Sequence, residues 1–319
     1  MLIPDDERAA EWRSLLSRPV LRDSFQSPAV DVELDVAARS DSGKVLVSNT
    51  DHYVVMRQGR FLETLLSSLS PADLPPRYLE CGYAAIVADG IGDAGAGIWA
   101  SRLAISTLVQ LAIRYGKWNV RISPETAAEL REQGEFFYRE ANDAVLRARQ
   151  THEKLGAIAA SLTAIYIAGT DLFFAHAGHS KAFLFRNGAL VALTTDDTLE
   201  ERRPIHPGPM DSTGRLIVDQ QHILTEALGG RPDGPNVDIE HVQLWSGDRL
   251  LLCTNGLTDV VDDDLIADVL ALRRTPTEEC TRLIDLALTA GGPDNVTVIV
   301  GDYRIHAHDA AESAPASTF

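Results

Sequence analysis

Short apolar runs separated by turn residues dominate this chain, and no other feature restricts its fold as strongly. The runs at 182–185 and 190–193 are joined by Asn187-Gly188, the strongest short signal for a β-hairpin. The runs at 162–167 and 172–177 flank a short polar turn in the same way. Because a hairpin pairs its strands in antiparallel fashion, the sequence predicts mostly antiparallel sheets and not a doubly wound parallel sheet.

Further strands and helices follow from the remaining periodicities. Residues 30–36 alternate strictly between apolar and acidic side chains, which is typical of a half-buried strand. Additional strands are expected at 53–56, 83–88, 241–244, 250–253 and 296–300. Helical spacing of apolar residues predicts helices at 95–113 and 125–149. A capping box of Thr275 and Glu278 begins a last helix, which ends at a Gly-Gly pair, so the predicted fold class is α+β.

The chain is expected to contain one large folded domain with a segment on either side. Its 319 residues are 45% hydrophobic and 24% charged, which is ordinary globular composition. We place the domain at 29–304. Residues 1–28 are predicted to be an N-terminal extension with one short helical stretch at 7–16, and residues 305–319 a disordered tail.

Charge and cysteine content exclude several classes of protein. Lys and Arg total 29 and Asp and Glu total 46, which gives a net charge of −17 that nucleic acid and anionic membranes repel. Cys81, Cys253 and Cys280 are odd in number and scattered, so neither a disulfide framework nor a CxxC zinc site is expected. With no signal-peptide pattern and no apolar run near the ~20 residues of a membrane helix, we expect a cytoplasmic protein.

Asp, Asn and Gly gather where predicted strands end. Asp51 precedes one strand, Asp89-Gly90 follows another, Asn255 comes shortly after a third, and Asp294-Asn295 precedes the last. Hard divalent cations prefer oxygen ligands, and carboxylates at strand ends supply them rigidly. The same residues also build ordinary turns, so their spacing alone does not distinguish a metal site from a set of turns.

Five segments resemble one known family. In chain order they are Asn-Thr-Asp at 49–51, Val-Ala-Asp-Gly-Ile-Gly at 87–92, Ala-Gly-His-Ser-Lys-Ala-Phe at 177–183, the run from Gly-Asp-Arg to Leu-Thr-Asp at 247–259, and Gly-Gly-Pro-Asp-Asn-Val-Thr at 291–297. Together they resemble the bacterial PPM (protein phosphatase 2C) family of metal-dependent serine/threonine protein phosphatases, over about 30–303. The resemblance implies two antiparallel sheets packed face to face and flanked by antiparallel helix pairs.

The resemblance also implies a chemistry and a set of site residues. In the family, two Mg²⁺ or Mn²⁺ ions lie between the sheets and activate a water that attacks phosphoserine or phosphothreonine. By position, Asp89 would bridge the two metals and the carbonyl oxygen of Gly90 would contact one. Asp294 would bind the other metal, Asp51 would orient metal-bound water, and Asp259 is a further candidate ligand.

The site departs from the family pattern in five places. Thr50 replaces a glutamate ligand, and Asn255 replaces an aspartate ligand. Leu46 replaces the arginine that clamps the substrate phosphate, and His179 replaces an aspartate linked to a third metal. Ala-Ala-Ser at 159–161 replaces a Gly-Thr-Thr stretch. Fewer ligand charges weaken metal binding, and a leucine cannot make a bidentate phosphate contact.

Two residues leave the metal site open to more than one interpretation. Asp93 adds a carboxylate close to Asp89, and His179 is a candidate nitrogen ligand, which together would suit a site rebuilt for Mn²⁺, Fe²⁺ or Zn²⁺. The plainer interpretation is that Asp93 caps the following helix and that His179 is a hydrogen-bonded histidine at a strand end.

These departures favour a pseudophosphatase, meaning a PPM-like protein that binds phosphoproteins or regulatory partners of a kinase pathway without efficient turnover. It would hold one or two Mg²⁺ or Mn²⁺ ions weakly, or none. The alternative is an active Mg²⁺- or Mn²⁺-dependent phosphatase, which the retention of Asp89 and Asp294 supports. A third hypothesis is that the resemblance misleads and that the chain is an unrelated α+β domain.

Overall fold

A computed structural model describes residues 31–70, 74, 77–92, 96–117, 122–151, 158–194, 227–237 and 239–306. The predicted extension at 1–28, most of the predicted tail and the candidate ligand Asp93 lie outside these residues. None of the helices in the described part of the chain combines the length and the apolar character that a membrane span requires.

The first sheet contains five antiparallel strands in the order β1-β10-β9-β6-β7. β1 (Asp31–Asp41) pairs along its whole length with β10 (Val296–His306). β9 (Arg249–Cys253) lies on the other side of β10. β6 (Lys181–Arg186) and β7 (Ala189–Ala192) complete the sheet as the hairpin that the Asn-Gly pair predicts.

The second sheet also contains five antiparallel strands, in the order β2-β3-β4-β5-β8. Its strands are β2 (His52–Glu63), β3 (Arg77–Ile91), β4 (Ala159–Ala168), β5 (Asp171–Ala177) and β8 (Ile239–Gln243). Every pairing between neighbours is antiparallel. The prediction of mostly antiparallel sheets is therefore confirmed in the described part of the chain.

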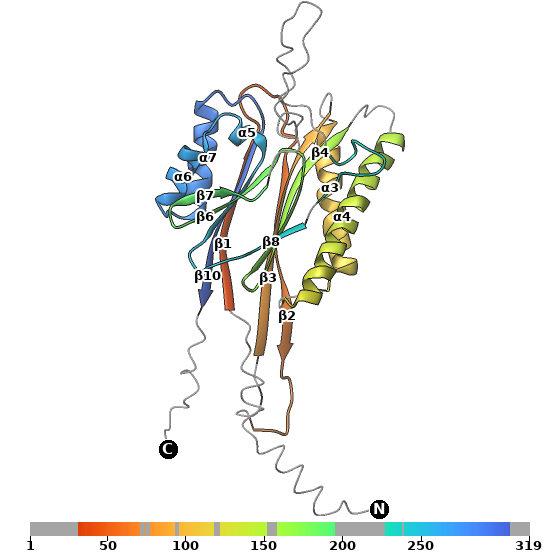
Figure 1. Ribbon diagram of the computed structural model, residues 1–319, viewed down its shortest axis with the longest axis vertical. Coiled ribbons are helices and arrows are strands. Elements are labelled where there is room, and N and C mark those ends of the chain that lie inside the picture. The colour runs from red at the N-terminus through yellow and green to blue at the C-terminus, as the bar shows by residue number, and fades with distance from the viewer. Residues whose placement is uncertain are drawn as a thin grey trace, which may run out of the picture.

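Helices cover the outer face of each sheet, so that the molecule has four layers (Figure 1). α3 (Gly97–Tyr115) and α4 (Pro124–Thr151) pack on the second sheet. α5 (Asn255–Thr258), α6 (Asp263–Ala271) and α7 (Pro276–Thr289) pack on the first sheet. The expected sandwich of two sheets between helix pairs is confirmed, and α7 begins with the predicted Thr275–Glu278 capping box.

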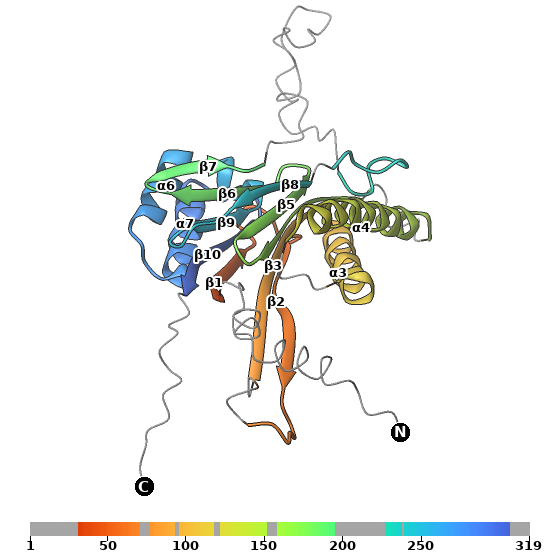
Figure 2. The same ribbon diagram turned by 60° about the horizontal axis from the view of Figure 1, so that its bottom comes forward.

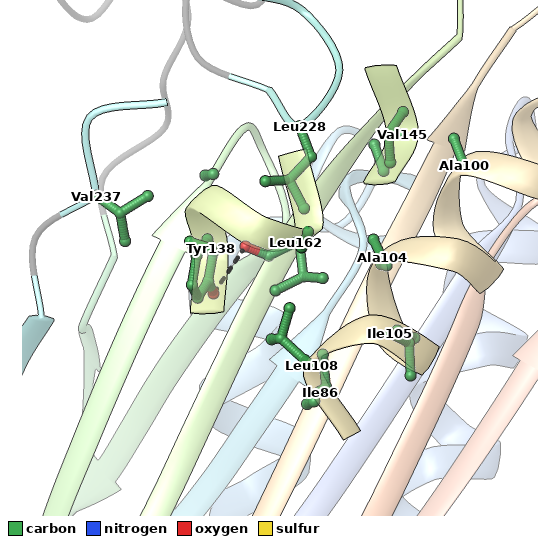
Figure 3. Packing of buried hydrophobic residues seen from close by; sticks show 14 of the residues in the cluster. Ile86, Ala100, Ala104, Ile105, Leu108, Tyr138, Val145, Leu162, Leu228 and Val237 are labelled. Carbon is green, nitrogen blue, oxygen red and sulfur yellow. Dashed lines mark hydrogen bonds between the residues drawn. The ribbon is translucent and has the colours of Figure 1, made fainter. Parts of the chain in front are cut away.

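Apolar side chains fill the space between each pair of layers. Between the second sheet and its helices, Ile86 and Leu162 of the sheet meet Leu108 of α3 and Tyr138 of α4 (Figure 3). The buried hydroxyl of Tyr138 donates hydrogen bonds to the carbonyl oxygens of Leu162 (3.4 Å) and Ala175 (2.9 Å). This layer fixes α3 and α4 against the strands that carry part of the site.

Several predicted strands are shorter than the strands of the structure. β1 continues through the expected polar turn at 39–44 as far as Asp41, because β10 offers it a partner at every position. β10 continues to His306, so two residues of the tail expected from 305 belong to the sheet, where Ile305 pairs with Val32. A strand partner distant in the sequence gives no local signal, and the predictions stopped where local alternation stopped.

β2 and β3 extend well beyond the other strands of their sheet. β4 pairs with β3 only from Gly82 onward, whereas β2 pairs with β3 as far as Glu63 opposite Arg77. Residues 59–63 and 77–81 therefore form a two-stranded ribbon that projects from the body of the molecule (Figure 2). We call this ribbon, with the described residues 64–70 that follow β2, the arm.

Candidate active site

Three acidic residues that are distant in the sequence meet at one end of the two sheets. Asp51 immediately precedes β2, Asp89 lies near the end of β3, and Asp294 precedes β10. β2 and β3 run antiparallel with His52 opposite Ala88, which places Asp51 beside Asp89. The charge of Asp294 acts on both of them. The structure therefore brings together three of the residues that the sequence singled out.

Asp51 is buried and held by two threonines. Its Oδ2 accepts hydrogen bonds from the hydroxyls of Thr254 (2.7 Å) and Thr297 (2.8 Å). Its Oδ1 is also buried and has no amide or hydroxyl donor among the described residues. Burial raises the pKa of Asp51 to about 6, opposed by the two threonine hydrogen bonds and assisted by the charge of Asp294.

Asp89 also has a raised pKa. Burial raises the pKa of Asp89 well above its ordinary range, and the charges of Asp51 and Asp294 raise it further. Crowded buried carboxylates of this kind fit a divalent cation, because its charge would offset their mutual repulsion.

The acidic side chains of this cluster do not form a complete set of metal ligands. Within the described residues, no three side chains of His, Cys, Asp or Glu are grouped closely enough to hold a metal ion. The acidic residues are thus close enough to interact through their charges but do not form a compact ligand set.

Thr50 turns toward a neighbouring loop residue. Its backbone N–H and its hydroxyl both donate to Oδ1 of Asn295, at 2.8 and 3.0 Å. The amide nitrogen of Asn295 donates in turn to the carbonyl oxygens of Ser42 (2.9 Å) and Ser48 (3.1 Å). Asn295 therefore holds the loop between β1 and β2 in place, and the two hydrogen bonds from Thr50 are part of this contact.

Asn255 is the first residue of α5 and is buried. Its amide nitrogen donates to Oδ2 of Asp259 at 2.9 Å. Asp259 is exposed at the end of the same short helix. With its nitrogen engaged, Asn255 offers at most a neutral carbonyl oxygen to a metal, where an aspartate would offer a charged one.

His179 lies beside Asp89 in the turn between β5 and β6. Its Nε2 is 3.7 Å from Oδ2 of Asp89, a distance compatible with an ion pair but too long for a hydrogen bond. Its backbone N–H donates to Oγ of Ser161 (3.0 Å), the residue that pairs with Asp89 in the neighbouring strand. The structure thus places His179 next to the candidate bridging carboxylate.

Gly90 and the first turn of α3 are in direct backbone contact. A Cβ atom on Gly90 would lie 2.0 Å from the carbonyl oxygen of Gly97, so only glycine fits there. Ser101 of the same helix donates its hydroxyl to the carbonyl oxygen of Thr50 (2.6 Å). α3 therefore holds the end of β3 and the start of β2, which carry Asp89 and Asp51.

Two further sequence candidates are Leu46 and Asp93. Leu46 lies in the loop between β1 and β2 with 43% of its surface exposed. Asp93 lies outside the described residues. Sequence reasoning assigned no role to Thr254 or Thr297, which fix Asp51, and named Asn295 only as part of the strand-end cluster, without its role in fixing the adjoining loop. Their one available signal was position, since each lies within three residues of a residue that was singled out.

Comparison with known proteins gives a consistent result. No family model matches the chain. It is 31% identical to the serine/threonine protein phosphatase PstP of Mycobacterium tuberculosis over 279 residues, which cover 86% of this chain and 46% of PstP. It is 29% identical to the serine/threonine phosphatase Stp of Listeria monocytogenes over 217 residues, 67% of this chain and 82% of Stp. The chain thus spans about half the length of its mycobacterial relative.

Solved structures extend the comparison to the fold. A crystal structure of M. tuberculosis PstP is 30% identical and superposes with a TM-score of 0.63 over 86% of this chain and 99% of that one. Another structure, of the PstP catalytic domain in complex with two manganese ions, gives the same identity and TM-score. With that identity, near-complete coverage of the solved domain and the same four-layer fold, this chain belongs to the PPM family of serine/threonine protein phosphatases.

Proposed function

We propose that this protein is a catalytically impaired PPM phosphatase, a pseudophosphatase that binds phosphorylated or regulatory proteins of a kinase pathway in the cytoplasm. The observation that carries the proposal is the composition of the two substituted ligand positions. Thr50 donates its hydroxyl to Asn295, and Asn255 donates its amide to Asp259. Two negative charges that the family pattern supplies to the metals are therefore missing, and ligand charge is a main determinant of divalent-cation affinity.

The residues that remain fit a weak divalent-cation site. Asp89, Asp294 and the carbonyl oxygen of Gly90 would hold Mg²⁺ or Mn²⁺, with Asp259 and Asn255 as weaker candidates. Asp51, fixed by two threonine hydroxyls, would accept hydrogen bonds from water at that site. Such ions supply a water nucleophile for phosphate-ester hydrolysis. Without an arginine at position 46, the substrate phosphate would lack a bidentate clamp.

A second candidate function is an active phosphatase of phosphoserine and phosphothreonine. The buried group of Asp51, Asp89 and Asp294 favours it. Burial, and then the charge of neighbouring carboxylates, raises the pKa of Asp51 and of Asp89, and a bound cation would relieve the repulsion. A function limited to protein binding would not require this arrangement. The two candidates therefore differ in turnover and not in the fold or the location of the site.

Mn²⁺-dependent hydrolysis of para-nitrophenyl phosphate by the purified protein separates them. Under the proposal, the wild type is inactive, Thr50→Glu with Asn255→Asp gains activity, and adding Asp89→Asn to that pair abolishes it. Wild-type hydrolysis that disappears in Asp89→Asn would establish the active phosphatase instead. Calorimetric titration of a phosphothreonine peptide and its unphosphorylated form tests the binding function in the same preparations.

Metal content distinguishes an impaired site from one rebuilt around His179. After incubation with Mn²⁺, Fe²⁺ or Zn²⁺ and desalting, we expect wild type and His179→Ala with Asp93→Ala to retain equal amounts of metal. A clear loss of metal in the double variant would assign ligand roles to these residues.

A further inference from the structure

The arm exposes an unusual number of large apolar side chains. They are Phe61, Leu62, Leu65, Leu66, Leu69 and Leu79, and each has more than half of its surface exposed. Single exposed apolar residues are common, but several large ones on one short segment indicate a surface that other groups cover. A two-stranded ribbon is also only marginally stable in water without a packing partner. The arm therefore has the properties of a surface that is covered.

One face of the arm continues the apolar core between the two sheets. Tyr83 and Val87 of β3 are buried in that core, and side chains alternate along a strand, so Cys81 and Leu79 lie on the same face. Leu79 pairs across the ribbon with Phe61, and their exposed fractions are 54% and 56%. The core thus ends at Tyr83, and an open apolar face begins just beyond it.

β1 begins at the base of this open face. Leu34 packs in the same core as Tyr83, and a hydrogen bond links the phenol of Tyr83 to the backbone of Leu34. β1 runs from Asp31 toward the acidic site, so β1 begins at the end of the sandwich where the arm projects (Figure 1). Four strand residues separate Tyr83 from Leu79, a distance of ~13 Å.

The preceding segment has the length and the composition to cover the arm. Thirty residues precede Asp31, whereas four or five extended residues would span ~13 Å. Their sequence places Trp12, Leu15 and Leu16 at helical spacing between charged residues. The acidic run at 5–7 also complements Arg57, which is exposed on β2 and lies on the same face as Phe61.

We propose that residues 1–30 bind in cis to the apolar face of the arm, with Trp12, Leu15 and Leu16 against Phe61 and Leu79. The arm is at the far end of β2 from Asp51, twelve strand residues or ~40 Å away. Binding there leaves the acidic site accessible. The segment therefore covers the arm whether or not the protein hydrolyses phosphate esters, and a protein partner of the arm would first have to displace it.

Cys81 provides a native probe of this contact. It lies on the proposed face and is partly exposed, whereas Cys253 and Cys280 are buried. The test compares wild type with the full chain carrying Trp12→Ser, Leu15→Ser and Leu16→Ser. We expect 5,5′-dithiobis(2-nitrobenzoate) to modify Cys81 at least about tenfold faster in this triple variant. A tenfold ratio corresponds to a contact that is formed more than ~90% of the time in wild type. The variant Arg8→Ser with Glu11→Ser, which alters polar residues of the same segment, should keep the wild-type rate. Cys81→Ser gives the background from the other two thiols.

Each alternative gives a different result in this experiment. Equal rates in wild type and the triple variant, whether fast or slow, would overturn the proposal. Protection of Cys81 that increases with protein concentration would show that a second copy covers the arm, which also overturns it. Hydrogen exchange is the second measurement: amides of the arm at 59–63 and 77–81 should exchange faster in the triple variant, while β9 stays unchanged.

Discussion

The buried acidic group makes the metal-free protein sensitive to pH, and Asp51→Asn tests this directly. Burial raises the pKa of Asp51 from 3.8 to about 6, so the folded state binds a proton more tightly than the unfolded chain does. Stability from this group is therefore greatest at acid pH and is lost as the pH rises through about 6. The full effect of a shift of about two pKa units is ~3 kcal/mol in the free energy of unfolding.

Only part of this change in the free energy of unfolding occurs between pH 7.5 and 5.0, the two values used for the measurement. On lowering the pH from 7.5 to 5.0, linkage predicts that Asp51 adds ~1.4 kcal/mol to the free energy of unfolding. Asp51→Asn removes the titrating group, so the stability of the variant should rise less than that of wild type by this amount. The raised pKa of Asp89 acts in the same direction in the wild type.

Urea unfolding in EDTA at the two pH values measures the difference, with equal denaturant slopes as the check that the same transition is followed. Asp263→Asn, which removes an exposed acidic residue from the first turn of α6, is the matched control. An equal dependence on pH in wild type and Asp51→Asn would refute the reasoning. Saturating Mn²⁺ at pH 7.5 should stabilise wild type, because a bound cation offsets the repulsion between the carboxylates.

Three other substitutions give distinct outcomes. Gly90→Ala should lower the free energy of unfolding by ~1–3 kcal/mol and weaken Mn²⁺ binding, because its Cβ would collide with the carbonyl oxygen of Gly97; urea unfolding and calorimetry check both effects. Arg249→Met should lower the free energy of unfolding, measured by urea denaturation, by ~3–5 kcal/mol, because it leaves the buried Glu279 without its ion-pair partner. The double variant Arg249→Met with Glu279→Met should recover most of this loss. Asn255→Asp should tighten Mn²⁺ binding at least about tenfold by calorimetry while lowering metal-free stability, because a carboxylate would then face Asp259; unchanged affinity would count against position 255 as a ligand.

Local patterns predicted the elements whose cause is local. The Asn187-Gly188 hairpin and the Thr275–Glu278 capping box both appear in the structure. The lengths of β1, β3 and β10 were underestimated, because their outer parts pair with strands far away in the sequence. The projecting arm could not be predicted either, because residues 53–63 do not indicate where the pairing of β4 with β3 ends.

The site was predictable as a set of positions but not as an arrangement of bonds. The family resemblance located Asp51, Asp89 and Asp294, and the structure places them together. That Thr50 and Asn255 direct their polar groups to Asn295 and Asp259 depends on loop geometry, which the order of residues does not disclose. The roles of these residues in metal binding stay predictions for the experiments above.

The pairing of β1 with β10 has a consequence for how the protein is made. Ser40 of β1 and Thr297 of β10 have hydroxyls 2.7 Å apart but are separated by 257 positions in the sequence. β1 therefore cannot pair until β10 has been synthesised. At ~5–20 residues per second, a ribosome needs roughly 13 to 50 s to supply that partner. Until then the edges of β1 and β9 are unpaired, and Asp51 lacks the hydroxyl of Thr297. Synthesis of β10, and not collapse of the earlier segments, therefore sets the moment at which the acidic centre can assemble.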